Sequence, residues 1–310
     1  MQEILHTFGI HAEILSQKML SGGRIHGTYL LRTEAGDYIA QKLHPTAFPD
    51  PERLMRKLIS VTDYLRPQCT TLHFYPAKGG GYLHDGWRLM DAIPGVTRSA
   101  PDPETVRAAG RTYGAFQAML CGYELPEPEP FFHDPARYFS LLPQNADNHR
   151  VQALLDALNA LRPAACALSG MQLPVRMLHN DTKLTNLLFS PGTGVPLAVI
   201  DLDTVGTGYA AYDFGDALRS LHGHSTEPSP VLITAFTDGF LEGASHLTEA
   251  ECDSLLYGAA AVTAELAARY LADHLTGNRY FRNPDSLSRA EQLTALAKGF
   301  CLCYNIDIPL

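Results

Sequence analysis

The chain has 310 residues, of which 45% are hydrophobic, so it is long enough to bury a large core and to divide into two lobes. Its formal net charge of −9 and pI near 5.8 argue against nucleic acid as a partner, since a surface that binds the phosphate backbone is normally basic. No run of eighteen apolar residues and no cationic, hydrophobic leader occurs, so neither a membrane span nor secretion is expected.

The first part of the chain predicts a small sheet with one helix. Apolar segments suited to strands occur at Ile10–Leu20, Thr28–Arg32, Tyr38–Leu43 and Trp87–Pro94. Asp50 and Pro51 begin a helix that runs to Leu65 with its apolar residues on one face. A glycine-bearing turn that contains Gly23 and Arg24 joins the first two strands, and its backbone N–H groups are expected to bind nucleotide phosphates.

Helices dominate after Pro94-Gly95, the predicted boundary between an N-terminal lobe of residues 1–94 and a C-terminal lobe of residues 95–310. Apolar stripes at helical spacing cover residues 102–121, 151–168 and 248–275, the last of which opens with a capping box. Residues 123–135 form a connector rich in Pro, Glu and Phe. Its His133 belongs either to the packed interior of the lobe or to a substrate site.

A polar loop between apolar strands, within residues 174–205, carries the clearest sign of chemistry. Strands are predicted at Val175–Leu178, Leu187–Phe189 and Leu197–Ile200. The loop HNDTKLTN follows the first strand, and Asp201-Leu202-Asp203 follows the last. The strands therefore hold acidic and amide side chains at their ends, as a rigid scaffold holds a binding or catalytic loop.

Asp181 and Asn186 have the spacing of Asp and Asn in the H-R-D-x-x-x-x-N catalytic loop of protein kinases. There the Asp accepts the proton of the substrate hydroxyl, and the Asn binds Mg²⁺. Asp201, at the end of a following strand, is then a second metal ligand, and Lys183 neutralises charge on the transferred phosphoryl group. The alternative is that Asp181 and Asn186 only cap backbone N–H groups.

These motifs resemble those of a known family. HNDTKLTN, VIDLDT and YDFGDALR are similar to motifs of the aminoglycoside phosphotransferase and choline kinase superfamily and, more narrowly, of the N-acetylhexosamine 1-kinases. The resemblance takes in most of the chain, through IHGTYLL (Ile25–Leu31), YIAQKL with FPDPERLMR (Tyr38–Arg56), AGRTYGAFQ (Ala109–Gln117), FHDPARY (Phe132–Tyr138) and ARYLADHLTGNRYF (Ala268–Phe281).

The resemblance implies an α+β, two-lobe, protein-kinase-like fold with a small antiparallel sheet in the N-terminal lobe and a mainly helical C-terminal lobe. It also implies a kinase that uses ATP and Mg²⁺ to phosphorylate the anomeric hydroxyl of an N-acetylhexosamine. A kinase for another sugar, an amino alcohol or an aminoglycoside stays open, as does a nucleotide-binding regulatory pseudokinase. A cationic substrate requires an acidic pocket in the helical lobe, where Glu265 and Asp273 are available.

Nucleotide contacts are also implied by the resemblance. The third strand supplies a cation to the α- and β-phosphates, and Lys42 is the expected residue. Because Gln41 and Lys42 point to opposite faces of the strand, only one of them can face the phosphates. Backbone groups from Met90 to Ile93 are expected to bind the adenine edge.

The remaining implied residues support the loop or bind the sugar. His179, Asp213 and Asp216 are expected to support the catalytic loop. Arg269 and Tyr280 are expected to contact sugar hydroxyls, because the hexosamine kinases carry a matching Arg and Tyr at the same separation. Asp203 is expected to reach the sugar, a second metal ion or Lys183, and the alternative for it is a purely structural role.

The cysteines indicate the redox environment. Six are present without a C-x-x-C pair or a Cys/His cluster, which favours free thiols in a reducing cytoplasm over a disulfide framework or a zinc site.

Overall fold

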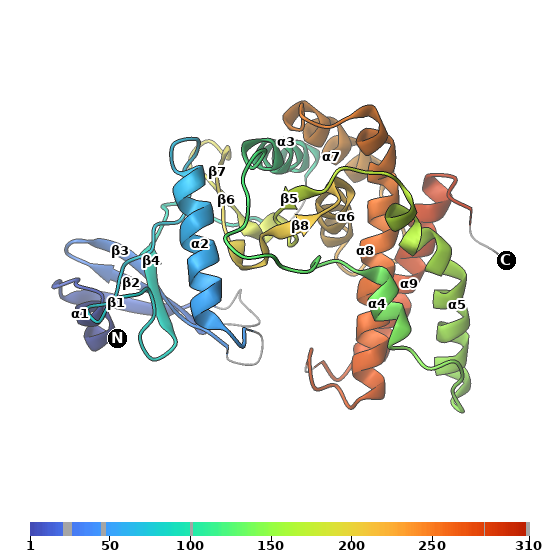
Figure 1. Cartoon of the computed structure of the whole chain (residues 1–310), viewed down its shortest axis with the longest axis horizontal. Coiled ribbons are helices and arrows are strands. Elements are labelled where there is room, and N and C mark those ends of the chain that lie inside the picture. The colour runs from blue at the N-terminus through green and yellow to red at the C-terminus, as the bar shows by residue number, and fades with distance from the viewer. Residues whose placement is uncertain (21–26, 45–47, 100–101, 282, 308–310) are drawn as a thin grey trace.

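The computed structural model of the chain describes residues 1–20, 27–44, 48–99, 102–281 and 283–307. A small sheet and a helical region lie at opposite ends of an elongated molecule (Figure 1). The sheet is antiparallel with its strands in chain order: β1 (Ile14–Met19), β2 (Gly27–Thr33), β3 (Gly36–Lys42) and β4 (Trp87–Asp91). The α+β arrangement predicted from the sequence, an antiparallel sheet followed by a mainly helical lobe, is confirmed.

The two faces of this sheet pack against different elements. One face packs on α1 (Gln2–Thr7), in a cluster that includes Leu5, Leu31, Tyr38, Ala40 and Leu89. The opposite face, which carries Ile39 and Met90, contributes to the main core together with α2 (Pro51–Leu65). The strands therefore alternate between an α1 side and an α2 side, and the α2 side faces the rest of the molecule.

The helix α2 forms as its sequence predicts and joins the two lobes. The Asp50 carboxylate accepts the Arg53 N–H at 2.9 Å, and Pro51 occupies the first turn. The expected apolar face is buried, with Leu54, Leu58, Val61 and Leu65 in the main core. On its polar side, Lys57 pairs with Glu129 of the connector at 2.9 Å. Both faces of α2 thus contact the C-terminal lobe.

Two short pairs of strands lie between the sheet and the helices (Figure 1). Their members are β5 (Arg176–Leu178) with β8 (Gly206–Gly208), and β6 (Leu187–Phe189) with β7 (Pro196–Val199). The first, second and third of the predicted strands in this region are β5, β6 and β7, whereas β8 was not predicted. The segments between these strands are the polar loop and the Asp201–Asp203 turn.

Helices make up most of the C-terminal lobe. The described helices are α3 (Pro103–Met119), α4 (Pro135–Ser140), α5 (His149–Cys166), α6 (Ala210–Leu221), α7 (Pro230–Gly243), α8 (Glu249–Leu275) and α9 (Ser286–Cys303), with 3₁₀ turns η1 (Ala167–Gly170), η2 (Leu184–Asn186) and η3 (Leu202–Thr204). The sequence predicted α3, α5 and α8, and the capping box of Thr248 and Glu251 opens α8 as expected. None of the described helices is long and apolar enough to cross a membrane. The boundary at Pro94-Gly95 stays a prediction.

Glycines let pairs of helices approach closely. A Cβ atom on Gly258 of α8 would lie 1.8 Å from the Ala211 carbonyl oxygen of α6, so the contact requires glycine. The same holds for α3 and α7, where a Cβ on Gly239 would lie 2.0 Å from the Arg107 carbonyl oxygen. The first contact fixes α6 against α8, and α6 carries Asp213 and Asp216.

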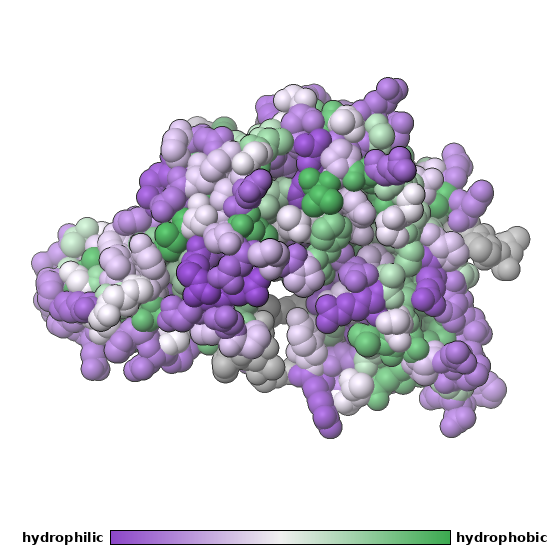
Figure 2. Space-filling model, viewed as in Figure 1, coloured by the Kyte–Doolittle hydropathy of each residue, from purple (hydrophilic) through white to green (hydrophobic). Residues whose placement is uncertain are grey.

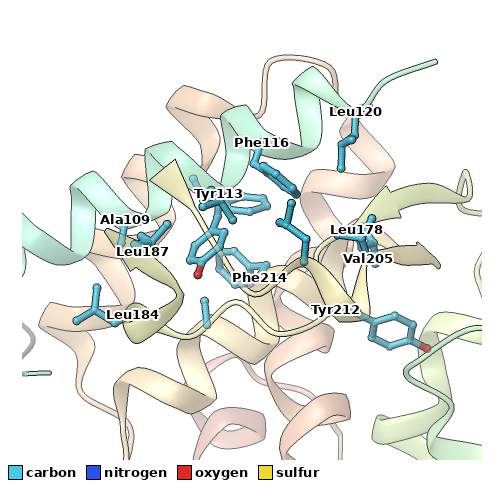
Figure 3. Close-up of a cluster of buried hydrophobic side chains, with 14 of the residues drawn as sticks. Ala109, Tyr113, Phe116, Leu120, Leu178, Leu184, Leu187, Val205, Tyr212 and Phe214 are labelled. Atoms are coloured by element: carbon cyan, nitrogen blue, oxygen red, sulfur yellow. The ribbon is translucent and has the colours of Figure 1, made fainter. Parts of the chain in front are cut away.

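A single apolar cluster reaches from α2 through the short strands β5 and β6 to α9. Figure 3 shows its centre, where Tyr113 and Phe116 of α3 point toward Phe214 of α6 and Leu178 of β5. The polar loop therefore rests on a packed core and not on a flexible surface.

Candidate active site

The loop of residues 179–186 connects β5 to β6 and is anchored by the buried carboxylate of Asp213 in α6. The N–H groups of His179 and Asn180 donate to this carboxylate at 3.0 and 2.7 Å, and Gln117 Nε2 donates at 3.0 Å. Burial raises the pKa of Asp213, and the nearby His179 and these hydrogen bonds oppose the rise. Three donors on one carboxylate fix the start of the loop.

His179 ties the loop to the end of β7. Its Nδ1 accepts the Asp181 N–H at 3.2 Å, so Nε2 carries the proton and donates to the Ile200 carbonyl at 2.9 Å. The ring is fully buried between Tyr113 and Phe116, whose centroids lie 5.8 and 5.7 Å away. The structure places His179 among supporting contacts and not at the surface of the loop.

Asp181 is oriented by two neighbours that it reaches within the loop. Asn186 Nδ2 donates to the Asp181 carbonyl at 2.7 Å and to Oδ2 at 3.1 Å, and Lys183 Nζ lies 2.7 Å from Oδ2. Among the described residues, no donor contacts the Oδ1 atom. One carboxylate oxygen is thus held by the protein, and the other is available to a hydroxyl group.

Lys183 is held in place through its backbone and its charge. The Tyr113 hydroxyl donates to the Lys183 carbonyl at 2.6 Å, and Tyr113 extends from α3 toward this loop (Figure 3). Burial lowers the pKa of Lys183, but the Asp181 carboxylate outweighs that effect and Asp201 adds to it, so the pKa lies above its ordinary value. Lys183 is therefore a cation at neutral pH beside the Asp181 carboxylate.

Asp201 carries a carboxylate that forms no ion pair with any residue in the described part of the chain. It lies two residues after the end of β7 in the left-handed region, at φ +61°, and no described residue makes a hydrogen bond or ion pair with its side chain. Although the residue is exposed, surrounding protein raises the pKa of its carboxyl by desolvation, and the carboxylates of Asp203 and Asp181 raise it further. Such a group favours the approach of a cation.

The donor set at this point fits Mg²⁺. Nδ2 of Asn186 faces Asp181, so the Asn186 Oδ1 atom points away from Asp181. No described residue donates a hydrogen bond to the Asn186 Oδ1 atom. Amide and carboxylate oxygens are hard ligands, and Mg²⁺ usually takes one or two carboxylates together with substrate phosphates. Within the described ranges no cluster of three or more His, Cys, Asp or Glu side chains is suited to hold a metal alone. Asn186 and Asp201 would therefore hold Mg²⁺ together with the phosphates of a bound nucleotide.

Strand alternation separates Gln41 from Lys42. Lys42 lies on the α1 side of β3, donates to the Asp85 carbonyl and sits 5.5 Å from the Trp87 ring. Gln41 lies on the α2 side, where its Oε1 accepts from Arg88. The structure therefore does not bring Lys42 to the catalytic loop, because the residue before it occupies the face that points there.

Arg88 of β4 links that face of the sheet to Asp203. Its Nη1 and Nη2 lie 2.8 and 2.9 Å from the two carboxylate oxygens of Asp203. Asp203 was expected to contact the sugar, a second metal or Lys183. The structure instead places its carboxylate, 4% exposed, against Arg88, which is the outcome expected for a structural role.

The segment expected to bind adenine, Met90 to Ile93, begins at the end of β4. The N–H groups of Asp91 and Ala92 donate to the carbonyls of His73 and Asp37, at 3.1 and 3.0 Å, and Met90 is buried within the sheet. The Ile93 N–H has no acceptor among the described residues. Ile93 is thus the member of this segment that keeps a free backbone donor. Gly23 and Arg24 lie outside the described residues.

The two residues expected to bind the sugar, Arg269 and Tyr280, lie close together near the end of α8. The Arg269 guanidinium lies 4.9 to 5.9 Å from the centroids of four aromatic rings, which belong to Phe132, Tyr138, Tyr280 and Phe281. Its Nη1 lies 3.7 Å from Glu265, one turn earlier on the helix. Arg269 and Tyr280 are thus brought together as the sequence expects.

A carboxylate holds the loop that carries Tyr280. Asp273 accepts the N–H groups of Tyr280 and Phe281 at 2.7 and 3.0 Å, which folds the loop back onto α8. Tyr280 is 63% exposed, so its hydroxyl is open to a ligand. Figure 2 shows the surface hollowed between the N-terminal lobe and the loop after α8.

Most of the chain, including the loop of residues 179–186, matches the model of a known protein family. A family model described as "Phosphotransferase enzyme family" matches residues 16–251, which include the sheet, the loop of residues 179–186 and both Asp201 and Asp213. The chain belongs to the phosphotransferase enzyme family. Membership in this family confirms the expectation that the chain is a small-molecule kinase, without naming its substrate.

Solved structures with the same fold cover nearly all of this phosphotransferase. A microcompartment-associated aminopropanol kinase is 19% identical, with a TM-score of 0.69 over 99% of this chain and 98% of that chain. The choline kinase LicA from Streptococcus pneumoniae is 15% identical, with a TM-score of 0.64 over 97% and 98%. An amicoumacin kinase in complex with AMP-PNP, Ca²⁺ and Ami is also 15% identical, with a TM-score of 0.63 over 94% and 91%. At these identities the likeness shows the kinase-like fold alone.

Two charged side chains of α6 form a largely buried ion pair. Asp216, the second acid of α6, pairs with Arg219 at 2.6 Å. Burial raises the pKa of Asp216, but Arg219 and His133 outweigh it, so the pKa is lowered. The Asp216 carboxylate also helps to raise the pKa of Lys183. The charge of Asp216 therefore acts on both Lys183 and His133.

Several residues of the site had no local sequence signal. Tyr113 and Gln117 appeared only as members of an apolar helix stripe, yet their polar atoms hold Lys183 and Asp213. Arg88 was one cation on a predicted strand, and its partner lies 115 positions later. The alternation of β4, together with the aromatic residue before it, was the only hint that Arg88 points toward α2.

Proposed function

We propose that the chain is an ATP- and Mg²⁺-dependent kinase that phosphorylates the anomeric hydroxyl of an N-acetylhexosamine. The arrangement of Asp181, Lys183 and Asn186 beside the unpaired Asp201 is the observation that carries the kinase activity. Phosphoryl transfer asks for positioned charges more than for covalent chemistry, and these four side chains supply them.

Each side chain has a separate task in the proposed reaction. Oδ1 of Asp181 orients the acceptor hydroxyl and accepts its proton, while Oδ2 stays fixed by Asn186 and Lys183. Lys183 stabilises negative charge on the transferred phosphoryl group. Asn186 and Asp201 would hold Mg²⁺, which when bound neutralises phosphate charge. The free N–H of Ile93 is the proposed adenine donor.

The charges around Arg269 favour an uncharged acceptor. The aromatic rings that would suit a cationic substrate already enclose a cation of the protein itself. Of the two acids available for an amine, Glu265 is 1% exposed and contacts His133 and Arg269, and Asp273 accepts two backbone N–H groups. Arg269 and Tyr280 are left as donors for the hydroxyls or the acetamido carbonyl of a sugar.

An amino alcohol or aminoglycoside is the second candidate. Its support is that the similar structures include aminopropanol, choline and amicoumacin kinases. A regulatory pseudokinase is the third candidate, and the intact set of Asp181, Lys183, Asn186 and Asp201 argues against it.

A substrate panel separates these candidates. Phosphate transfer from ATP is measured with N-acetylglucosamine, N-acetylgalactosamine, glucose, galactose, choline, ethanolamine, 1-amino-2-propanol and kanamycin, and products are located by ³¹P NMR. We expect turnover with the N-acetylhexosamines and phosphate on the anomeric oxygen. Turnover with only the amines would replace the sugar assignment, and Mg·ATP binding without turnover on any acceptor would support the pseudokinase.

A further inference from the structure

A buried ion pair joins the N-terminal sheet to the turn that follows Asp201. Arg88 and Asp203 form two parallel N–H···O contacts of 2.8 and 2.9 Å, and the side chains are 3% and 4% exposed. Bidentate, charge-assisted contacts of this kind fix geometry as well as supply energy. The two residues come from different lobes, so the pair is a point of contact between the sheet and the catalytic segment.

The sheet holds Arg88 in one orientation. Gln41 Oε1 accepts from Nε of Arg88 at 2.9 Å and from Nη2 at 2.5 Å, and Gln41 Nε2 donates to Thr28 Oγ1 at 3.0 Å. Thr28, Gln41 and Arg88 are direct register partners across β2, β3 and β4. The Phe74 ring lies 5.7 Å from the guanidinium. Arg88 therefore presents its charge toward Asp203 as part of a row that spans three strands.

Asp201 and Asp203 are two carboxylates separated by one residue, and their surroundings differ. Asp203 is neutralised by Arg88, whereas Asp201 has no ion pair with any described residue. The two groups are close along the chain, because Asp201 caps the 3₁₀ turn η3 (Leu202–Thr204) that contains Asp203. A divalent cation that entered this corner would be attracted by both carboxylates if Arg88 were absent.

We propose that Arg88 is a positioning residue for phosphoryl transfer: by neutralising Asp203, it leaves Asp201 as the carboxylate that takes the metal. The inference rests on the proposed kinase function and adds a residue to its machinery. It also ties the metal position to the N-terminal sheet, since Arg88 is fixed by Gln41 and Phe74.

The two partners of the pair act on the metal in opposite directions. Without Arg88, Asp203 loses the cation that binds both of its carboxylate oxygens, so a free divalent cation binds more tightly but shifts away from Asn186, and turnover falls. Without Asp203, the guanidinium is an uncompensated positive charge near Asp201, so the cation binds more weakly. Removal of both partners returns the local charge to that of the wild type.

The experiment measures metal binding separately from activity. Full-length wild type, R88M, D203N and R88M/D203N are titrated with Mn²⁺ by electron paramagnetic resonance without nucleotide, and turnover with ATP, Mg²⁺ and the best acceptor is measured in parallel. R32M is the matched control, because Arg32 lies on the same sheet but is exposed and pairs with Asp37 at the surface. D201N reports whether Asp201 is a metal ligand at all.

We expect Mn²⁺ affinity to rise at least about fivefold in R88M and to fall by a similar factor in D203N. The double variant should lie within about twofold of the wild type, and R32M should not differ from it. Turnover should fall in R88M despite the tighter binding, which loss of structure alone does not produce. If R88M fails to fold, the expected fall of Mn²⁺ affinity in D203N still tests the inference.

Two outcomes would overturn the inference in different ways. Changes of the same sign in R88M and D203N, or no change in either, together with a clear loss of affinity in D201N, would exclude the role of Arg88 and leave the kinase assignment standing. Equal affinity in D201N and wild type would remove Asp201 as a ligand, and the metal assignment of the proposed function would fall together with this inference.

Discussion

Lys183 Nζ lies 2.7 Å from Oδ2 of Asp181, the same carboxylate oxygen that receives the amide of Asn186. One oxygen atom of Asp181 is thus held by a cation and an amide donor, and the other is left to a substrate hydroxyl. This division of a single carboxylate into a fixed side and a reacting side is what a positioned general base requires.

Asp181→Asn should remove the base and keep the shape of the loop. We expect turnover to fall by about a thousandfold or more, because the amide cannot accept the hydroxyl proton. The KM for ATP should change by less than about threefold, since Asp181 is not a proposed nucleotide contact. Steady-state kinetics with the best acceptor checks both values. Near-normal turnover in this variant would contradict the assigned role.

Asp213→Asn should weaken the whole catalytic loop. The buried carboxylate accepts three N–H groups, and an amide in its place turns an NH₂ group toward at least one of these donors. We expect a loss of about 2 to 4 kcal/mol in the free energy of unfolding, measured by urea denaturation, with a parallel fall in turnover.

The matched control for this change is Asp63→Asn. Asp63 lies on the exposed side of α2, and its one ion pair with a described residue is with Arg66, three residues later. Its replacement should alter stability by less than about 0.5 kcal/mol. Equal effects of the two substitutions would show that Asp213 is not the anchor of the loop.

Arg269→Lys should affect the sugar and not the nucleotide. Lysine keeps a positive charge near Glu265 but loses the planar group that lies among four aromatic rings. We expect the KM for the acceptor to rise about tenfold or more, with the KM for ATP unchanged. A rise in both constants would indicate a general loss of structure and would count against a sugar contact.

The loop of residues 179–186 was predictable because its polar residues lie close together in the sequence. Asp181 and Asn186 lie five positions apart, and Asp201 directly follows an apolar strand, so position along the chain was enough to bring them together. Contacts across long separations were not predictable in this way. Arg88 meets Asp203 only because β4 faces α2 in the folded sheet, and alternation alone could not decide whether Gln41 or Lys42 shares that face.

Some elements were missed because packing, not propensity, makes them. The strand β8 has the sequence Gly-Thr-Gly and forms because β5 offers it an edge. The helix α7 contains Gly239 and Gly243, which lower helix propensity but allow close contact with α3. The helix α9 buries Ser286 and Thr294 together with Leu293, Leu296 and Phe300, so polar residues interrupt the apolar stripe that would mark it.

His133→Gln should change how stability depends on pH. His133 is buried and its Nδ1 lies 3.3 Å from Glu265; burial lowers its pKa, but Glu265 and then Asp216 outweigh burial and the opposing Arg269, so the pKa is raised. The charged ring therefore contributes stability that is fully present below the unfolded pKa of about 6.5 and is lost as pH rises through the higher folded value. Urea unfolding across this window should show the wild type's advantage over the variant shrinking as pH rises, since the other charges are common to both. A difference independent of pH would mean that His133 stays neutral and serves only to fill space beside Tyr212.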